Sequence, residues 1–156
     1  MTQPAALRPL DAPQEDVDRW VTARVGPSGF RTEVETRSHG FIADEPVSLG
    51  GTDEGPTPYE LLLAALGSCM AITLRMYADR KGWPLERVQV ALRTARSHEV
   101  DCEHCATKSV GITHIQRRLE LVGRLDDEQR ARLLDISNRC PVKQTLERGI
   151  HIVDVK

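Results

Sequence analysis

Residues 58–82 decide how this chain folds, and they read PYELLLAALGSCMAITLRMYADRKG. Leucine, alanine and methionine dominate the stretch, and all three are good helix formers. Thr57 followed by Pro58 suits the start of a helix, and Gly82 suits its end. Because residues 61–72 are apolar nearly all round, we predict a long helix that is buried in the middle of the fold.

The stretch before this helix alternates apolar and polar side chains, as β-strands do. Residues 21–25 and 30–36 alternate on either side of a Gly/Pro turn at 26–29, which predicts a β-hairpin. Residues 41–43 predict a third short strand. A loop rich in glycine and proline, residues 45–58, then leads into the helix.

After the long helix the pattern returns to strands. Residues 88–93 alternate, and residues 112–122 offer a second apolar strand. A polar insertion at 97–109 separates the two. We therefore predict a second antiparallel pair joined by a long connection.

Two shorter helices and a last strand complete the pattern. Asp126 with Gln129 three residues later resembles a capping box, so a helix is expected from there to Arg139. Pro141 opens a shorter helix, and residues 150–153 suit a strand. The order βββαββααβ, with strands in runs, predicts an α+β fold.

Size and charge narrow the possible functions. A chain of 156 residues suits a single domain, which we place at 19–156 behind a flexible arm at 1–18. The formal net charge is −2 with no block of like charges, which argues against nucleic acid and membrane surfaces as partners. The apolar run at 61–74 is shorter than the roughly 20 residues of a membrane span. Small molecules or proteins are the expected partners.

The four cysteines carry the candidate chemistry. Without a secretory signal at the N-terminus they suit a reducing compartment, so we predict a cytoplasmic protein with free thiols. Cys69 lies in the most apolar helix, where burial alone would make a thiol an inert core residue. Cys140 precedes Pro141 at a helix N-terminus, where free N–H groups favour a thiolate. Structural and reactive interpretations both stay open on these residues alone.

The second cysteine pair is Cys102 and Cys105, with His98 and His104 nearby. Thiolates and imidazole suit zinc, but a structural site needs four ligands and one imidazole with the two thiols gives only three. A redox CxxC normally begins a helix, whereas this one lies in a connection between strands. We expect an ordinary loop and no metal. The chain also lacks nucleotide-binding, zincin and serine-hydrolase motifs.

Two segments in this order resemble the signature regions of the OsmC/Ohr family. They are GPTPYELLLAALGSC at 55–69 and Cys140-Pro141-Val142. The resemblance implies an intertwined homodimer in which Cys69 is the peroxidatic thiol and Cys140 resolves it. It further implies organic hydroperoxides as substrates, a dithiol such as a lipoyl group as reductant, and no cofactor. The short segments Asp44-Glu45-Pro46 and Gly50-Gly51 resemble the corresponding segments of family members that are sometimes fused to an α/β-hydrolase domain.

The chain departs from the family pattern at the residues that support the thiol. Family peroxidases carry a glutamate ten residues before the helix cysteine, and Tyr59 stands there instead. Glu60 follows it, but nine steps of about 100° place position 60 opposite Cys69. No lysine, arginine or histidine occurs between His39 and Arg75. Any cation that lowers the pKa of the Cys69 thiol is therefore expected to come from Arg24, Arg31, Arg37 or His39.

Three functions follow from these residues. The first is reduction of organic hydroperoxides through a Cys69 sulfenate and a Cys69–Cys140 disulfide. The protein would then be an oxidoreductase, a peroxidase that acts in oxidative stress. The second is a dimer without peroxidase activity that binds a small apolar ligand near Cys69. The third is a zinc-binding interaction protein organised by Cys102 and Cys105.

Overall fold

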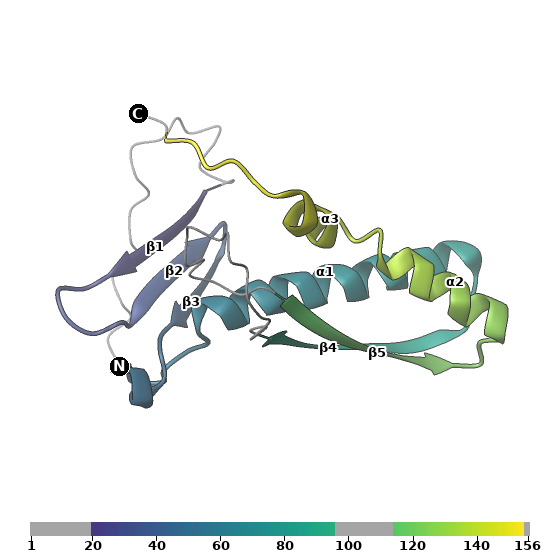
Figure 1. Ribbon diagram of the computed structural model, residues 1–156, viewed down its shortest axis with the longest axis horizontal. Coiled ribbons are helices and arrows are strands. Elements are labelled where there is room, and N and C mark those ends of the chain that lie inside the picture. The colour runs from purple at the N-terminus through teal and green to yellow at the C-terminus, as the bar shows by residue number, and fades with distance from the viewer. Residues whose placement is uncertain (1–19, 96–113, 155–156) are drawn as a thin grey trace, which may run out of the picture. The chain divides into compact units, whose positions relative to one another are not determined.

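The computed structural model describes residues 20–95 and 114–154 (Figure 1). Its contacts group into two compact units, one up to Leu61 and one from Leu62 onward. The predicted single domain at 19–156 stays a prediction. The predicted arm at 1–18 lies outside the described residues.

The first unit holds a three-stranded antiparallel sheet. Its strands are β1 (Val21–Val25), β2 (Thr32–Thr36) and β3 (His39–Ala43), in the order β1-β2-β3. Val21 pairs with Thr36, and Thr36 pairs in turn with His39. The predicted hairpin and third strand are confirmed. A single 3-10 turn, η2 (Val47–Leu49), follows the sheet.

The loop after β3 is held by the carboxylate of Asp44, which is only 2% exposed. This carboxylate accepts hydrogen bonds from the Thr52 hydroxyl at 2.6 Å and the Thr52 N–H at 2.9 Å, and from the Glu45 N–H at 2.8 Å. Farther along, Gly55 lies so close to β3 that a Cβ there would stand 2.1 Å from the carbonyl oxygen of Ile42. The loop is therefore a packed connection whose conformation depends on these two residues.

The long helix α1 runs over Pro58–Lys81. A reciprocal pair of hydrogen bonds caps its start: the Thr57 N–H donates to the Glu60 carboxylate at 2.8 Å, and the Glu60 N–H donates to the Thr57 hydroxyl at 3.3 Å. Gly82 ends it in the left-handed region, with φ of 65°. The predicted helix and both of its end signals are confirmed.

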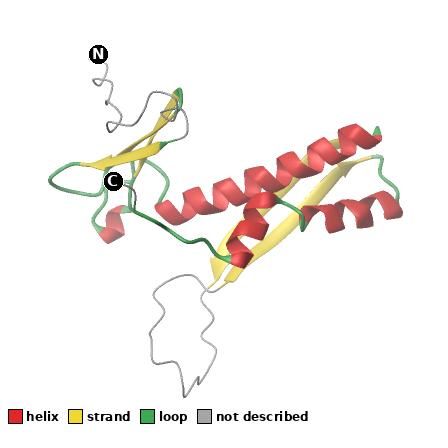
Figure 2. Cartoon of the chain, turned by 90° about the horizontal axis from the view of Figure 1, so that it is seen from above, coloured by secondary structure: helices red, strands yellow, loops and turns green. Residues whose placement is uncertain are grey.

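The second unit places α1 along the hairpin formed by β4 (Leu85–Ala95) and β5 (His114–Gly123). Helices α2 (Asp127–Ser137) and α3 (Pro141–Arg148) follow. Figures 1 and 2 show α1 and α2 on the same face of the hairpin. Between them lies the core: Leu66, Met70, Leu74, Ala78, Leu85, Leu125, Leu133, Ile136 and Cys140. The capping box predicted for α2 is present, with Gln129 N donating to Asp126 at 2.8 Å.

Burial of α1 is narrower than predicted. Only Leu66, Met70, Leu74 and Ala78 are buried, a single stripe at four-residue spacing. Ile72 is 58% exposed and Met76 is 67% exposed. By length and composition alone α1 would be able to cross a membrane, with a mean hydropathy of 1.6 over its most apolar window. Its stripe packs into a protein core, as in a core helix of a folded domain.

The predicted last strand does not form within the described chain. Residues 150–154 have no strand partner, and Ile152 is 93% exposed. A strand needs a neighbour for its N–H and C=O groups, and the described residues offer no such partner here. The other elements keep the predicted order, and the fold is α+β.

We predict that Asp44 makes the protein sensitive to acid. The hydroxyl of Thr52 lowers the pKa of Asp44 from 3.8 to about 2, with help from the N–H groups of Glu45, Glu54 and Thr52. A carboxyl whose pKa is depressed by folding stabilises the protein above its ordinary pKa. That contribution is lost as the pH falls from about 4 toward about 2. Urea unfolding across this range should show the loss in wild type and a smaller one in Asp44→Asn.

Asp53→Asn is the matched control for this experiment, because the neighbouring Asp53 makes no such set of hydrogen bonds in the described chain. It should unfold like wild type at every pH. Equal acid sensitivity of wild type and Asp44→Asn would contradict the assigned role of Asp44.

Candidate functional site

The two cysteines singled out from the sequence lie together in the second unit. Cys69 comes from the middle of α1, and Cys140 is the residue that immediately precedes α3. Cys69 packs against the core cluster that contains Cys140, and the two thiols are near enough for Cys69 to affect the pKa of Cys140. Both are free thiols; Cys69 is half-buried and Cys140 is 0% exposed. The chain thus presents one accessible thiol backed by one buried thiol.

The packing of α1 and α2 explains why these residues meet. Cys69 precedes Met70, one of the four buried residues of α1, so it lies about 100° from the centre of the stripe and at its edge. Leu133 and Ile136 bury α2 in the same core that holds Cys140. The turn between α2 and α3 is closed by the Arg139 N–H, which donates to the Ile136 carbonyl at 2.8 Å. This turn places Cys140 in the core cluster to which α1 also contributes.

Two opposing effects act on Cys140. Burial raises the pKa of its thiol, and the neighbouring Cys69 thiol raises it further. The backbone N–H groups of Lys143 and Val142 lower it, as expected at a helix N-terminus. Burial prevails and the pKa is raised. The sequence therefore located the helix N-terminus correctly, but the thiolate it favoured there is outweighed by desolvation.

The residues proposed to support the thiol either have other partners or lie exposed. The Glu60 carboxylate accepts a hydrogen bond from the Thr57 N–H at the start of α1, and this bond lowers the pKa of Glu60. Arg24 pairs with Glu35 at 3.2 Å, and Arg31 pairs with Glu54 at 2.8 Å. Tyr59 is 50% exposed at the first turn of α1. Arg37 and His39 are exposed at the β2–β3 turn.

Cys102, Cys105, His98 and His104 lie outside the described residues. Within residues 20–95 and 114–154, no three histidine, cysteine or acidic side chains gather as they would around a metal ion.

A cation that the sequence reasoning missed lies on β5. Leu92 on β4 faces Arg117, and the pairs on either side of it are Val90 with Leu119 and Thr94 with Ile115. The alternation of Ile115, Leu119 and Leu121 would have shown that Arg117 takes an inward position. Its guanidinium donates to the Ser137 hydroxyl at 2.9 Å and contacts the Met70 sulfur at 3.4 Å.

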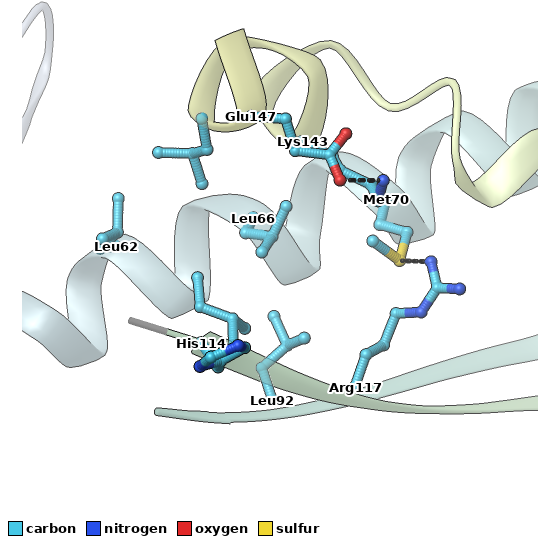
Figure 3. Close-up of a pocket in the computed structure, with 10 residues that line it drawn as sticks. Leu62, Leu66, Met70, Leu92, His114, Arg117, Lys143 and Glu147 are labelled. Atoms are coloured by element: carbon cyan, nitrogen blue, oxygen red, sulfur yellow. Dashed lines mark hydrogen bonds and ion pairs between the residues drawn. The ribbon is translucent and has the colours of Figure 1, made fainter. Parts of the chain in front are cut away.

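A cavity of about 660 Å³ opens beside this arginine. Figure 3 shows Arg117 rising from β5 toward Met70, with Leu62 and Leu66 of α1 along the wall. The whole lining is Leu62, Leu66, Met70, Leu92, His114, Ile115, Arg117, Lys143, Leu146 and Glu147. The volume falls in the range of about 300–1,000 Å³ that small-molecule sites occupy. Mostly apolar walls with a few charged groups are typical of such sites.

Fold and site together define an α+β protein with a pair of thiols where α3 follows α2 beside α1. A family model described as OsmC-like protein matches residues 51–153. This match covers most of the chain and includes both cysteines of the site. The chain belongs to the OsmC-like family, and the resemblance read from its sequence is confirmed.

Solved structures of the same family share this fold. An OsmC-like protein from Mycoplasma pneumoniae is 20% identical with a TM-score of 0.67, over 81% of this chain and 85% of that one. The organic hydroperoxide resistance protein OsmC of Legionella pneumophila is 20% identical with a TM-score of 0.58, over 80% and 85%. Organic hydroperoxide resistance protein OhrB of Bacillus subtilis is 21% identical with a TM-score of 0.53, over 83% and 90%. A comparison with curated proteins found no match.

The unequal settings of the two thiols predict unequal reactivity. At neutral pH, iodoacetamide should label Cys69 faster than Cys140, because Cys140 is buried and burial raises the pKa of its thiol. Labelling of Cys140 should rise only at more alkaline pH. Peptide mapping by mass spectrometry measures each site separately.

Protein unfolded in urea provides the control, since both cysteines should then react at similar rates. Faster labelling of Cys140 than of Cys69 in the folded protein would contradict the assigned environments.

Proposed function

We propose that this protein reduces organic hydroperoxides, with Cys69 as the peroxidatic thiol and Cys140 as the resolving thiol. The observation that carries the proposal is that these two thiols, from distant parts of the sequence, share one core cluster and lie near enough to interact. Relatives of the same fold carry the name organic hydroperoxide resistance protein, which supports the same activity.

The assignment of roles follows from exposure and charge. A peroxide must reach the attacking sulfur, and Cys69 is the more exposed of the two thiols. Cys140 is buried with a raised pKa, so it is protonated at neutral pH and is a poor first nucleophile. A buried thiol in the same core cluster is well suited to condense with an oxidised neighbour.

The chemistry then proceeds in three balanced steps. The Cys69 thiolate attacks the terminal oxygen of the peroxide, the O–O bond breaks, and the departing alkoxide takes a proton to leave as an alcohol. The resulting sulfenic acid condenses with the Cys140 thiol, which forms a disulfide and releases water. A dithiol, such as a lipoyl group, reduces the disulfide by thiol exchange and is itself oxidised. Cys69 supplies the electron pair, so no metal or organic cofactor takes part.

A homodimer is part of this proposal. Ile72 and Met76 leave apolar surface on α1 that the single chain does not cover, and residues 150–154 offer an unpaired segment. A second copy packed there would bury both. A reducing, cytoplasmic setting is also proposed, because the mechanism needs free thiols at rest.

The second candidate is a dimer without peroxidase activity that binds a small apolar ligand. The cavity between α1, β5 and α3 favours it, as does the engagement of Glu60 in the cap of α1. The two functions make opposite predictions for the thiols after exposure to peroxide.

The deciding experiment treats reduced protein with a single equivalent of cumene hydroperoxide and follows thiols by titration and intact mass. Wild type should lose two thiols as a disulfide that maps to Cys69 and Cys140. Cys69→Ser should lose none, and Cys140→Ser should stop at a sulfenic acid that dimedone traps. The expected rate loss for Cys69→Ser is complete, because no other group replaces the nucleophile.

A variant with both Cys102→Ser and Cys105→Ser is the matched control, and it should form the same disulfide as wild type. Wild-type protein that keeps all its thiols would refute the peroxidase proposal and leave the ligand-binding dimer in its place.

A further inference from the structure

The cavity beside α1 has a charge that neither function uses. The inner face of the β4–β5 hairpin consists of Val88, Val90, Leu92, Thr94, Ile115, Leu119 and Leu121, together with Arg117. An arginine at this position buries less apolar surface against the helices than a leucine or valine would. Its presence there calls for a physical explanation.

The immediate surroundings hold the guanidinium in place without neutralising it. Ser137 is fully buried, and its hydroxyl donates to the Leu134 carbonyl at 2.6 Å. The hydroxyl oxygen is therefore turned to accept from Arg117 at 2.9 Å. The other contact, at 3.4 Å, is the uncharged sulfur of Met70. Among the residues that the structure describes, no carboxylate pairs with Arg117.

The other charges at the cavity leave Arg117 unbalanced. Lys143 and Glu147 of α3 pair with each other at 2.5 Å, so their charges cancel (Figure 3). The guanidinium remains accessible from the cavity, and it carries one full positive charge at any physiological pH. Arg117 is exposed in the described chain, so an anion can reach its guanidinium from solvent.

We propose that this cavity binds an aliphatic monocarboxylate, with the carboxylate on Arg117 and the chain along the apolar wall. The wall offered to the chain consists of Leu62, Leu66, Leu92, Ile115 and Leu146. A guanidinium presents a pair of parallel N–H groups that match a carboxylate. A neutral ligand would leave the cation unpaired, and a dianion would exceed the single charge available.

The inference goes beyond hydroperoxide reduction, because binding a carboxylate involves no redox step, and it specifies the ligand class for the cavity that the second candidate function uses. It holds whether or not Cys69 reacts with peroxides. The site does adjoin the thiols: Met70 follows Cys69 on α1, and Lys143 lies one turn beyond Cys140 on α3.

Calorimetric titration of the reduced full-length protein with decanoate tests the proposal, with decanol as the uncharged ligand of equal chain length. Decanoate should bind wild type more tightly than decanol. Arg117→Gln should weaken decanoate binding about 10- to 100-fold, which corresponds to one hydrogen-bonded charge, and leave decanol unaffected. Arg118→Gln is the matched control: Arg118 pairs with Ala91, one position along from Arg117 and on the outer face. It should bind like wild type.

Several outcomes would overturn this site. Absence of decanoate binding to wild type would mean that the cavity is filled by something else, such as a second copy of the chain. Equal binding of decanoate and decanol, or equal binding by wild type and Arg117→Gln, would remove the role of the charge. If Arg117→Gln does not fold, as judged by circular dichroism, the comparison of the two ligands on wild type still decides.

Discussion

Burial of one stripe of α1 is the interaction on which the second unit depends. Leu66, Met70, Leu74 and Ala78 recur every four residues and face β4, β5 and α2. Burying a large apolar side chain contributes about 1.5–3 kcal/mol, so the three larger residues supply a substantial share of the unit's stability. The same stripe fixes the rotation of the helix. Because Met70 must point inward, Cys69 is held at the edge of the core, where it is half-buried and lies near Cys140.

The site illustrates how burial competes with the field of a helix terminus. At an exposed N-terminus the free N–H groups would favour a thiolate at Cys140. Here the turn after α2 draws that residue fully into the core, and the cost of desolvating a charge outweighs the N–H groups. The two cysteine side chains therefore differ in reactivity: Cys69 is accessible to a peroxide, whereas Cys140 is buried and protonated. Position, not residue type, distinguishes their chemistry.

The cavity and the thiol pair share their supporting elements. Helix α1 supplies Cys69 together with Leu62, Leu66 and Met70, and α3 follows Cys140 and supplies Lys143. Any change that moves α3, such as formation or loss of a disulfide at its first turn, would therefore alter one wall of the cavity. Arg117 stands across from these helices, held by a serine from α2. The low identity to relatives of the same fold is consistent with a shared framework around differing side chains.

The sequence by itself determined the elements and the family. Period-two alternation placed β1, β2 and β4, and apolar runs placed β3 and β5. Thr57, Gly82 and the Asp126–Gln129 pair marked helix ends, because caps and periodicity act over a few residues. The OsmC-like signature named Cys69 and Cys140 before any geometry was known. Tertiary structure alone decided how much of α1 is buried, why Cys140 stays protonated, that residues 150–154 lack a partner, and that Arg117 faces a cavity. Desolvation, strand pairing and cavity shape depend on residues that are far apart in the sequence and meet only in the folded protein. A local sequence pattern therefore cannot predict them.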